Sequence, residues 1–143
     1  MLPQSNIESI NFTDNTKMPS KTYRLDLNSK QIQGFIDGLE AIKQAVYKIL
    51  NTERYKYPIY SFNYGMELEE LIGKDILFIK ADLKRRLEEA LLQDDRITAI
   101  ENYKLEHIGE EIRVGFDVIT DSGNISVEKV VSIWLKLIPT KNY

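Results

Sequence analysis

Cysteine is absent from the 143 residues, and histidine occurs once, as His107. Without thiols the chain can form no disulfide and no thiolate nucleophile. A single histidine cannot complete a usual zinc set, and its place beside a predicted hairpin turn favours an exposed residue over a catalytic one. The seven glycines are scattered singly, so no phosphate-binding loop or dinucleotide fingerprint occurs. We therefore expect no metal and no cofactor.

An excess of positive charge and a long apolar run are also missing. Nineteen basic against 22 acidic residues give a formal net charge of -3, whereas nucleic-acid binders use a positive excess to displace counterions. No run approaches the roughly 18 apolar residues of a membrane span. The first residues contain no basic segment followed by an apolar one. We expect no nucleic-acid partner, no membrane partner and no export signal.

The composition that remains is that of an ordinary globular domain, with 43% hydrophobic and 29% charged residues. A chain of this length can form a single domain with one core. Residues 1–20 are polar and end near Pro19, so we interpret them as a flexible N-terminal arm, either frayed or partner-binding. The folded domain is then expected to cover residues 21–143.

Periodicity predicts the elements of the first two thirds. Alternating apolar and polar residues at 22–27 predict a half-buried strand, and a second short strand follows near 32–36. From about residue 37 to residue 52, apolar residues recur every three or four positions, which is typical of an amphipathic helix. The same spacing predicts the strongest helix at residues 75–93, with a short helix before it at 66–72.

The C-terminal third predicts an antiparallel meander. Strands are expected around residues 100–105, 112–119 and 125–137, separated by turns at Gly109-Glu110 and at residues 121–124. Val130-Val131 interrupts the alternation of the last strand and predicts a β-bulge. The whole pattern favours an α+β fold of one domain, in which two main helices pack on a mostly antiparallel sheet.

Carboxylates are numerous enough for a glycosidase, which needs two acids facing each other across a cleft. The candidates are Glu53 at the end of the first helix and Glu67 or Glu69 beyond Gly65. Twenty-two acids on a small surface also give close pairs by chance, as part of the solvated face. We therefore assign no catalytic residue.

A tyrosine-rich link at residues 53–65 joins the two halves of the chain. Tyrosines interleaved with Arg54 and Lys56 could stack on nucleic acid, but the acidic balance of the chain argues against this. Tyrosine and arginine are also enriched at protein interfaces. The link either packs on the domain or forms an interface.

The segment Asp94-Asp95-Arg96 lies where the second long helix ends and the meander begins. One interpretation is a polar corner that ends the helix, with Ile97 entering the core. The other is that the planar guanidinium of Arg96 clamps a carboxylate or carbonyls of a partner. The sequence leaves both open.

The order of these pieces resembles the baseplate wedge and sheath-initiator family of contractile phage tails, and most closely its PBSX-type prophage branch. The resemblance covers roughly residues 21–137. It rests on residues 41–54, on residues 58–65 with Leu68, and on residues 90–97. It implies a structural protein of the tail baseplate, present in several copies around the tail tube and assembled in the bacterial host cytoplasm.

Two kinds of contact follow from this resemblance. The family's Glu-Pro-Arg corner docks on the helical core bundle of large wedge proteins, and here Asp94-Asp95-Arg96 keeps the acid and the arginine but lacks the proline. The resemblance thus implies partner binding by Asp94 and Arg96, and we add Asp95 of the corner and Arg54 and Tyr64 of the link as candidate partner-binding residues. An edge of the sheet is expected to accept strands of the tail sheath. The family's historical label, tail lysozyme, leaves a peptidoglycan-degrading enzyme as the alternative.

Overall fold

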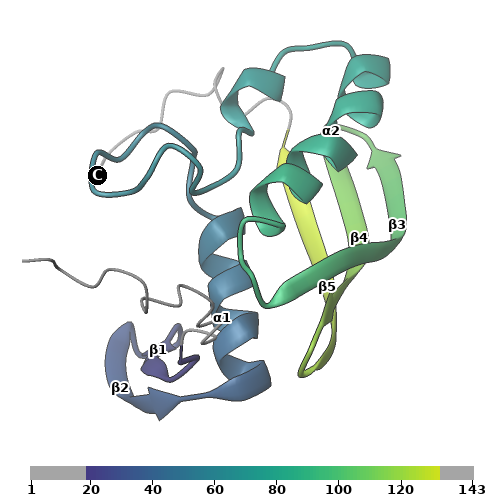
Figure 1. Cartoon of the computed structure of the whole chain (residues 1–143). Helices are drawn as coiled ribbons and strands as arrows, with labels where there is room; N and C mark the ends of the chain where they lie inside the picture. The colour runs from purple at the N-terminus through teal and green to yellow at the C-terminus, as the bar shows by residue number, and fades with distance from the viewer. Residues whose placement is uncertain (1–18, 133–143) are drawn as a thin grey trace, which may run out of the picture.

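The computed structural model describes residues 19–132 (Figure 1). The predicted N-terminal arm therefore lies outside the described residues except for its last two positions. The part of the last predicted strand beyond Ser132 lies outside them as well. The elements run in the order β1 (Thr22–Asp26), β2 (Gln31–Ile36), α1 (Gly38–Leu50), the short 3-10 helix η1 (Glu69–Leu71), α2 (Ile76–Leu91), β3 (Ile97–Ile108), β4 (Glu111–Thr120) and β5 (Gly123–Ser132).

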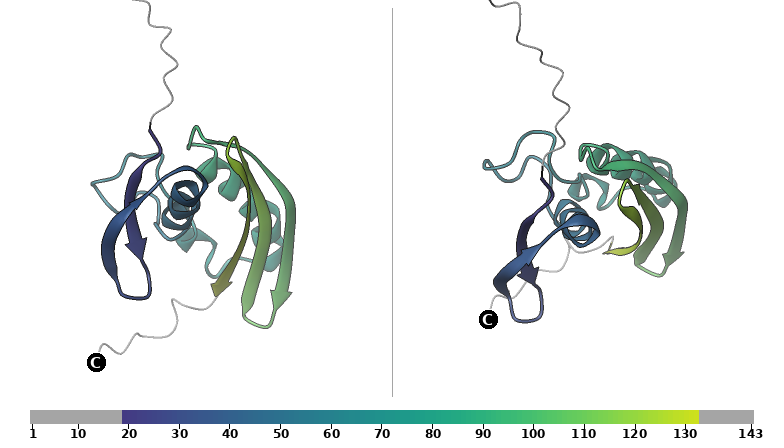
Figure 2. Two further views of the ribbon diagram at one scale, coloured as in Figure 1. Left: turned by 90° about the horizontal axis from the view of Figure 1, so that it is seen from below. Right: turned by 60° about the horizontal axis from the view of Figure 1, so that its bottom comes forward.

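The core lies between the two main helices and an antiparallel sheet of order β3-β4-β5 (Figures 1 and 2). The central strand β4 alternates strictly, so that Ile112, Val114, Phe116 and Val118 are buried against the helices. This confirms the predicted α+β class and the three-stranded C-terminal meander. Neither described helix is long and apolar enough to cross a bilayer.

Both main helices begin where their sequence provides a cap. The Asp37 carboxylate accepts the Gly38 N–H at 2.7 Å, and the Asp75 carboxylate accepts the Leu77 N–H at 3.4 Å. Such caps satisfy backbone donors that the first helical turn leaves unbonded. The predicted helices at 37–52 and 75–93 are confirmed, and the buried stripe of α2 contains one residue that periodicity did not indicate, Arg86. The short helix predicted at 66–72 is η1.

The first two strands differ from the prediction in their surroundings. They form a separate two-stranded sheet that lies against α1, outside the three-stranded sheet (Figure 2). The Gln44 side chain of α1 attaches it: its nitrogen donates to Tyr23 O at 2.8 Å and its oxygen accepts the Leu25 N–H at 2.8 Å. Tyr23 and Phe35 stack on each other with ring centroids 4.9 Å apart, yet both rings are exposed. The strands are therefore less buried than their alternation predicts.

The predicted bulge at Val130-Val131 is wrong. The β4–β5 register continues without a shift from Glu111↔Ser132 to Thr120↔Gly123, because Val130 simply occupies the outer, exposed face. The irregularities lie in β3 instead, and one of them falls between Glu101 and Lys104. Asn102 there has a φ of 52° and donates to the Asp117 carboxylate at 2.8 Å. A short polar side chain of this kind tolerates the left-handed conformation of a bulge.

Candidate partner-binding site

The corner, residues 94–96, is a self-contained ion pair at the end of α2. Arg96 donates from Nε to Asp94 Oδ1 at 2.8 Å and from Nη2 to Oδ2 at 2.6 Å, and its backbone N–H donates to the same Oδ1 at 3.1 Å. The bond from Arg96 holds the pKa of the Asp94 carboxyl below its ordinary value. Ile97 is buried behind the pair. The corner is thus fixed by its own carboxylate, without the proline of the family pattern.

The corner lines an open cleft of about 550 Å³. Tyr64 from the link and Lys48 from α1 line the same cleft, together with all three corner residues. Burial raises the pKa of the Tyr64 hydroxyl, and the neighbouring Tyr60 and Asp94 add to the effect. Four of the five residues predicted to bind a partner, Asp94, Asp95, Arg96 and Tyr64, are therefore brought together.

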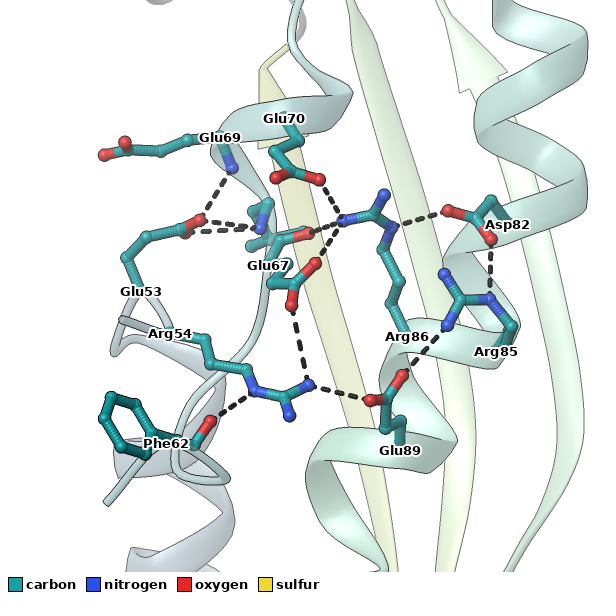
Figure 3. Close-up of polar contacts among 11 residues, drawn as sticks. Glu53, Arg54, Phe62, Glu67, Glu69, Glu70, Asp82, Arg85, Arg86 and Glu89 are labelled. Atoms are coloured by element: carbon teal, nitrogen blue, oxygen red, sulfur yellow. Dashed lines mark hydrogen bonds and ion pairs between the residues drawn. The ribbon is translucent and has the colours of Figure 1, made fainter. Parts of the chain in front are cut away.

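Arg54, the fifth predicted residue, lies apart from this cleft and bonds to its own chain (Figure 3). Its Nε donates to Phe62 O at 2.7 Å, and its Nη1 donates to Glu89 Oε1 at 2.8 Å and lies 3.5 Å from Glu67 Oε1. The side chain is only 11% exposed, and the bond to Glu89 raises its pKa. In this arrangement Arg54 fastens the link to α2 and offers little surface to a partner.

A second arginine, Arg86, completes the network around the link. Its Nε donates to Asp82 Oδ2 at 2.6 Å, and its Nη1 lies 3.0 Å from Glu67 Oε2 and 3.2 Å from Glu70 Oε2. Arg85 bonds Asp82 and Glu89 from the outer side (Figure 3). Bonds from Arg85 and Arg86 lower the pKa of Asp82 to about 2. The network ties α2 to the chain just before η1.

Sequence reasoning missed Arg86. Its spacing of four from Asp82, which places both on one side of a helix, was available in the sequence. Its position in the apolar stripe between Leu83 and Ala90 was available too. Its partners Glu67 and Glu70 lie 19 and 16 residues away, and no local pattern indicates that pairing.

The link itself forms a loop whose two ends meet, and we call residues 54–65 the aromatic loop. Arg54 N–H donates to Met66 O at 3.2 Å, and Met66 N–H donates to Thr52 O at 2.9 Å. Gly65 permits this closure: its φ is +96°, and a Cβ there would lie 2.6 Å from Thr52 O. Loops closed on themselves in this way are compact and frequently functional.

The aromatic loop divides its side chains between the core and the solvent. Tyr64 packs against the core cluster and stacks on Tyr60, with ring centroids 4.5 Å apart. Ile59 is 85% exposed and Phe62 is 81% exposed at the outer end of the loop. The packing interpretation is therefore confirmed for Tyr64. The outer end of the loop presents an exposed apolar surface, and its use as an interface stays a prediction.

The acids considered for catalysis have structural partners. The Glu53 carboxylate accepts the backbone N–H groups of Leu68 and Glu69, at 3.1 Å in each case, while burial raises its pKa. Glu67 pairs with Arg54 and Arg86, and Glu69 pairs with Lys56 at 3.0 Å. These contacts hold the start of η1 against the end of α1. Among residues 19–132, no cluster of three or more acidic or histidine side chains is placed to hold a metal ion.

Comparison with known proteins gave two matches. A family model described as contractile injection system sheath initiator matches residues 15–123, which include the aromatic loop and the corner. The chain is also 38% identical over 135 residues to the phage-like element PBSX protein XkdS of Bacillus subtilis (strain 168). That alignment covers 92% of this chain and 96% of the Bacillus protein.

Proposed function

This chain belongs to the contractile injection system sheath initiator family, and on that premise we propose that it joins the wedge proteins of a tail baseplate to the first ring of sheath. Sheath initiators are structural parts of contractile tails. The proposal for this chain assigns one surface to the sheath and another to the wedge proteins.

The edge of β5 is the surface proposed to receive the sheath. All ten residues of β5 pair with β4 in unbroken register, and within the described part of the chain no strand pairs with its other side. A strand edge of this kind presents N–H and C=O groups to which another chain can add a strand. This unbroken edge is the observation that carries the proposal.

A groove follows the same edge. It has a volume of about 470 Å³ and is lined by Tyr47 of α1, by Asn51 directly after this helix, and by consecutive β5 residues from Ile125 to Val130. Because neighbouring β5 residues point to opposite faces, a groove lined by all of them runs along the edge itself. An added strand, about 4.8 Å from β5, would lie over this groove and could bury its side chains against Tyr47.

The other edge of the sheet, β3, is less suited to strand addition. Its register shifts twice, between Ile97 and Ala99 and between Glu101 and Lys104. Irregularities of this kind twist an edge and interrupt the even row of donors and acceptors that an incoming strand needs. In the assembled tail we therefore expect an added sheath strand to pair with β5 and not with β3.

Amide hydrogen exchange distinguishes the two edges. Comparing the protein alone with the protein in isolated sheathed tails, we expect alternate amides of residues 123–132 to become protected by new backbone hydrogen bonds. Amides of residues 97–108 should keep their exchange rates. Protection gained in 97–108 alone would move the sheath contact to β3, and protection in neither strand would contradict strand addition.

The corner is proposed to face the wedge proteins, with Asp94, Asp95, Arg96 and Tyr64 around its cleft. Arg96→Ala should reduce the yield of assembled baseplates in an induced lysate, counted by electron microscopy in a strain whose own copy of the gene is deleted. Arg24→Ala, which changes an exposed arginine of β1, is the matched control and should complement fully. Normal numbers of sheathed tails from Arg96→Ala would contradict the role of the corner.

We further propose that the protein does not degrade peptidoglycan. The support is that Glu53, Glu67 and Glu69 are engaged in the contacts that close the aromatic loop. The purified protein should leave the turbidity of a cell-wall suspension unchanged. Clearing that disappears in Glu53→Gln would restore the enzymatic alternative.

A further inference from the structure

The aromatic loop ends in the most exposed large apolar side chains of the described chain, Ile59 and Phe62. We propose that this loop is a second attachment point to the wedge protein that docks at the corner, inserting these two side chains into an uncharged apolar pocket of that protein. The inference rests on the proposed function and deepens it by naming the chemistry of the partner surface.

The loop is held in shape before any partner arrives. Its two ends are joined by backbone hydrogen bonds between Arg54 and Met66 and between Met66 and Thr52. Inside the loop, Arg54 Nε bonds Phe62 O at 2.7 Å and so fixes the backbone beside one of the two exposed side chains (Figure 3). A surface organised in advance loses little conformational entropy on binding, which favours its use as an anchor.

The charge of the loop indicates what its partner must be. Residues 57–65 contain no ionisable acid or base of the Asp, Glu, Lys or Arg type. The two cations that precede them are already paired, Arg54 with Glu89 at 2.8 Å and Lys56 with Glu69 at 3.0 Å. A charged group in the floor of the partner's pocket would be desolvated without a counter-ion, which is unfavourable. The complementary surface is therefore apolar and uncharged.

Tyr64 connects the loop to the corner. It lines the cleft with Asp94, Asp95 and Arg96, and its ring stacks on Tyr60 of the loop. The exposed aromatic surface thus continues directly from the surface proposed to face the wedge protein. A single partner can cover both, which is why the wedge protein is the occupant we infer.

Other occupants fit the loop less well. Over residues 19–132, the larger clefts are lined by charged side chains, such as Lys43 and Glu128, so this part of a second copy offers no large uncharged pocket among them. The loop's cations are bonded to carboxylates, so they do not meet phosphates of nucleic acid or lipid.

Binding of the full-length protein to the purified large wedge protein of the same tail tests the inference. Phe62→Ser and Ile59→Ser should each weaken the complex about 10- to 100-fold, as truncation of buried anchors does. Ile32→Ser is the matched control, because Ile32 is an exposed apolar residue of the β1–β2 hairpin, away from the loop. All three should keep the thermal midpoint of the wild-type protein, since the side chains removed are exposed.

Charge substitutions sharpen the test. Ile59→Asp and Ile59→Lys should both weaken binding at least as much as Ile59→Ser, because neither charge finds a partner in an uncharged pocket. Wild-type affinity in Ile59→Lys would mean an acidic partner surface and would overturn the inference. Self-association, or binding to phosphatidylglycerol vesicles, that is lost in Ile59→Asp would overturn it in favour of a second copy or a membrane.

The failures of the two proposals are distinguishable. If Arg96→Ala weakens the complex while Phe62→Ser and Ile59→Ser bind normally, the corner remains the wedge contact and the loop inference is wrong. If the wild-type protein does not bind the wedge protein at all, the proposed function is overturned together with the inference.

Discussion

The aromatic loop and the corner each depend on an arginine bonded to carboxylate, but the two arginines reach very different distances along the chain. Arg96 bonds Asp94, two residues away, whereas Arg54 bonds Glu89, 35 residues away. The corner therefore carries its own support wherever the end of α2 is placed. The loop keeps its shape only while α1, η1 and α2 are packed together. Substitutions that remove long-range support should consequently cost more than substitutions at the corner.

The largest loss of folding stability is expected from a substitution at the centre of the long-range network. Arg86 is 9% exposed and bonds three acids, so Arg86→Ala should lower the free energy of unfolding by about 3 kcal/mol, because carboxylates near the core lose their counter-ion. Chemical denaturation measures this loss. Arg85→Ala is the control: Arg85 bonds two of the same network's acids but is 59% exposed, so its loss should be much smaller. Equal losses of stability in the two variants would show that the burial of an arginine does not determine its contribution.

The next largest loss of stability is expected from a substitution at the point where the aromatic loop closes. Gly65→Ala should cost about 2 to 3 kcal/mol, since the new Cβ meets Thr52 O and the backbone must adopt a positive φ. Gly73→Ala separates these two causes, because Gly73 has a φ of +83° but no atom within 4 Å of the new Cβ. The difference between the two thermal midpoints reports the contacts of the new Cβ with Thr52 O and with the backbone of Arg54. If Gly73→Ala cost as much, the closure of the loop would not explain the requirement for glycine.

The same substitution at the two arginines compares loop and corner directly. Arg54→Ala should cost about 2 kcal/mol and speed amide exchange across residues 55–64, because the loop loses its bonds to Phe62 O and Glu89. Arg96→Ala should cost about 1 kcal/mol or less, because the backbone N–H at position 96 still bonds Asp94. A larger loss in Arg96→Ala, measured by the same denaturation, would reverse the comparison.

The smallest expected effect is on acid stability. The pKa of Asp82 is lowered from 3.8 to about 2 by bonds from Arg85 and Arg86. A carboxyl whose pKa falls on folding stabilises the fold above its unfolded pKa, and this contribution is lost as the pH falls through the folded pKa. Between about pH 4 and pH 2, the wild-type protein should therefore lose more stability than Asp82→Asn. Parallel pH profiles would show that Asp82 does not contribute.

The elements that could be predicted from the sequence are those whose causes are local. Asp37 and Asp75 cap the helices that apolar spacing indicates, and the alternation of residues 112–119 identifies the central strand. The same alternation could not indicate which strands share a sheet. The β1–β2 hairpin is separate because Gln44 of α1, and not another strand, bonds the side of β1 that β2 leaves open.

The candidate site was predictable to the same degree. Asp94, Asp95 and Arg96 are adjacent in the chain, so the sequence alone places them together, whereas only the structure shows that Tyr64 lines the same cleft. Arg54 was expected at the partner surface, and that role stays a prediction. Its bonds to Glu89 and Phe62 O attach the aromatic loop to α2, which the spacing of residues in the sequence could not indicate. The bulge was expected at Val130 because a broken alternation looks the same whether the backbone shifts or an apolar residue faces solvent. The unbroken register between β4 and β5 shows that Val130 faces solvent and that the backbone there does not shift.

The side chain of Gln44 has a consequence for the protein before assembly. Its amide copies a peptide group, with the oxygen accepting Leu25 N–H and the nitrogen donating to Tyr23 O. It thus ends the hydrogen bonding of β1 as a neighbouring strand would, but it presents no new row of donors and acceptors beyond itself. Copies of the hairpin cannot stack through this side of β1 into a growing fibril. The protein can in this way carry an outlying hairpin without polymerising through this side of β1.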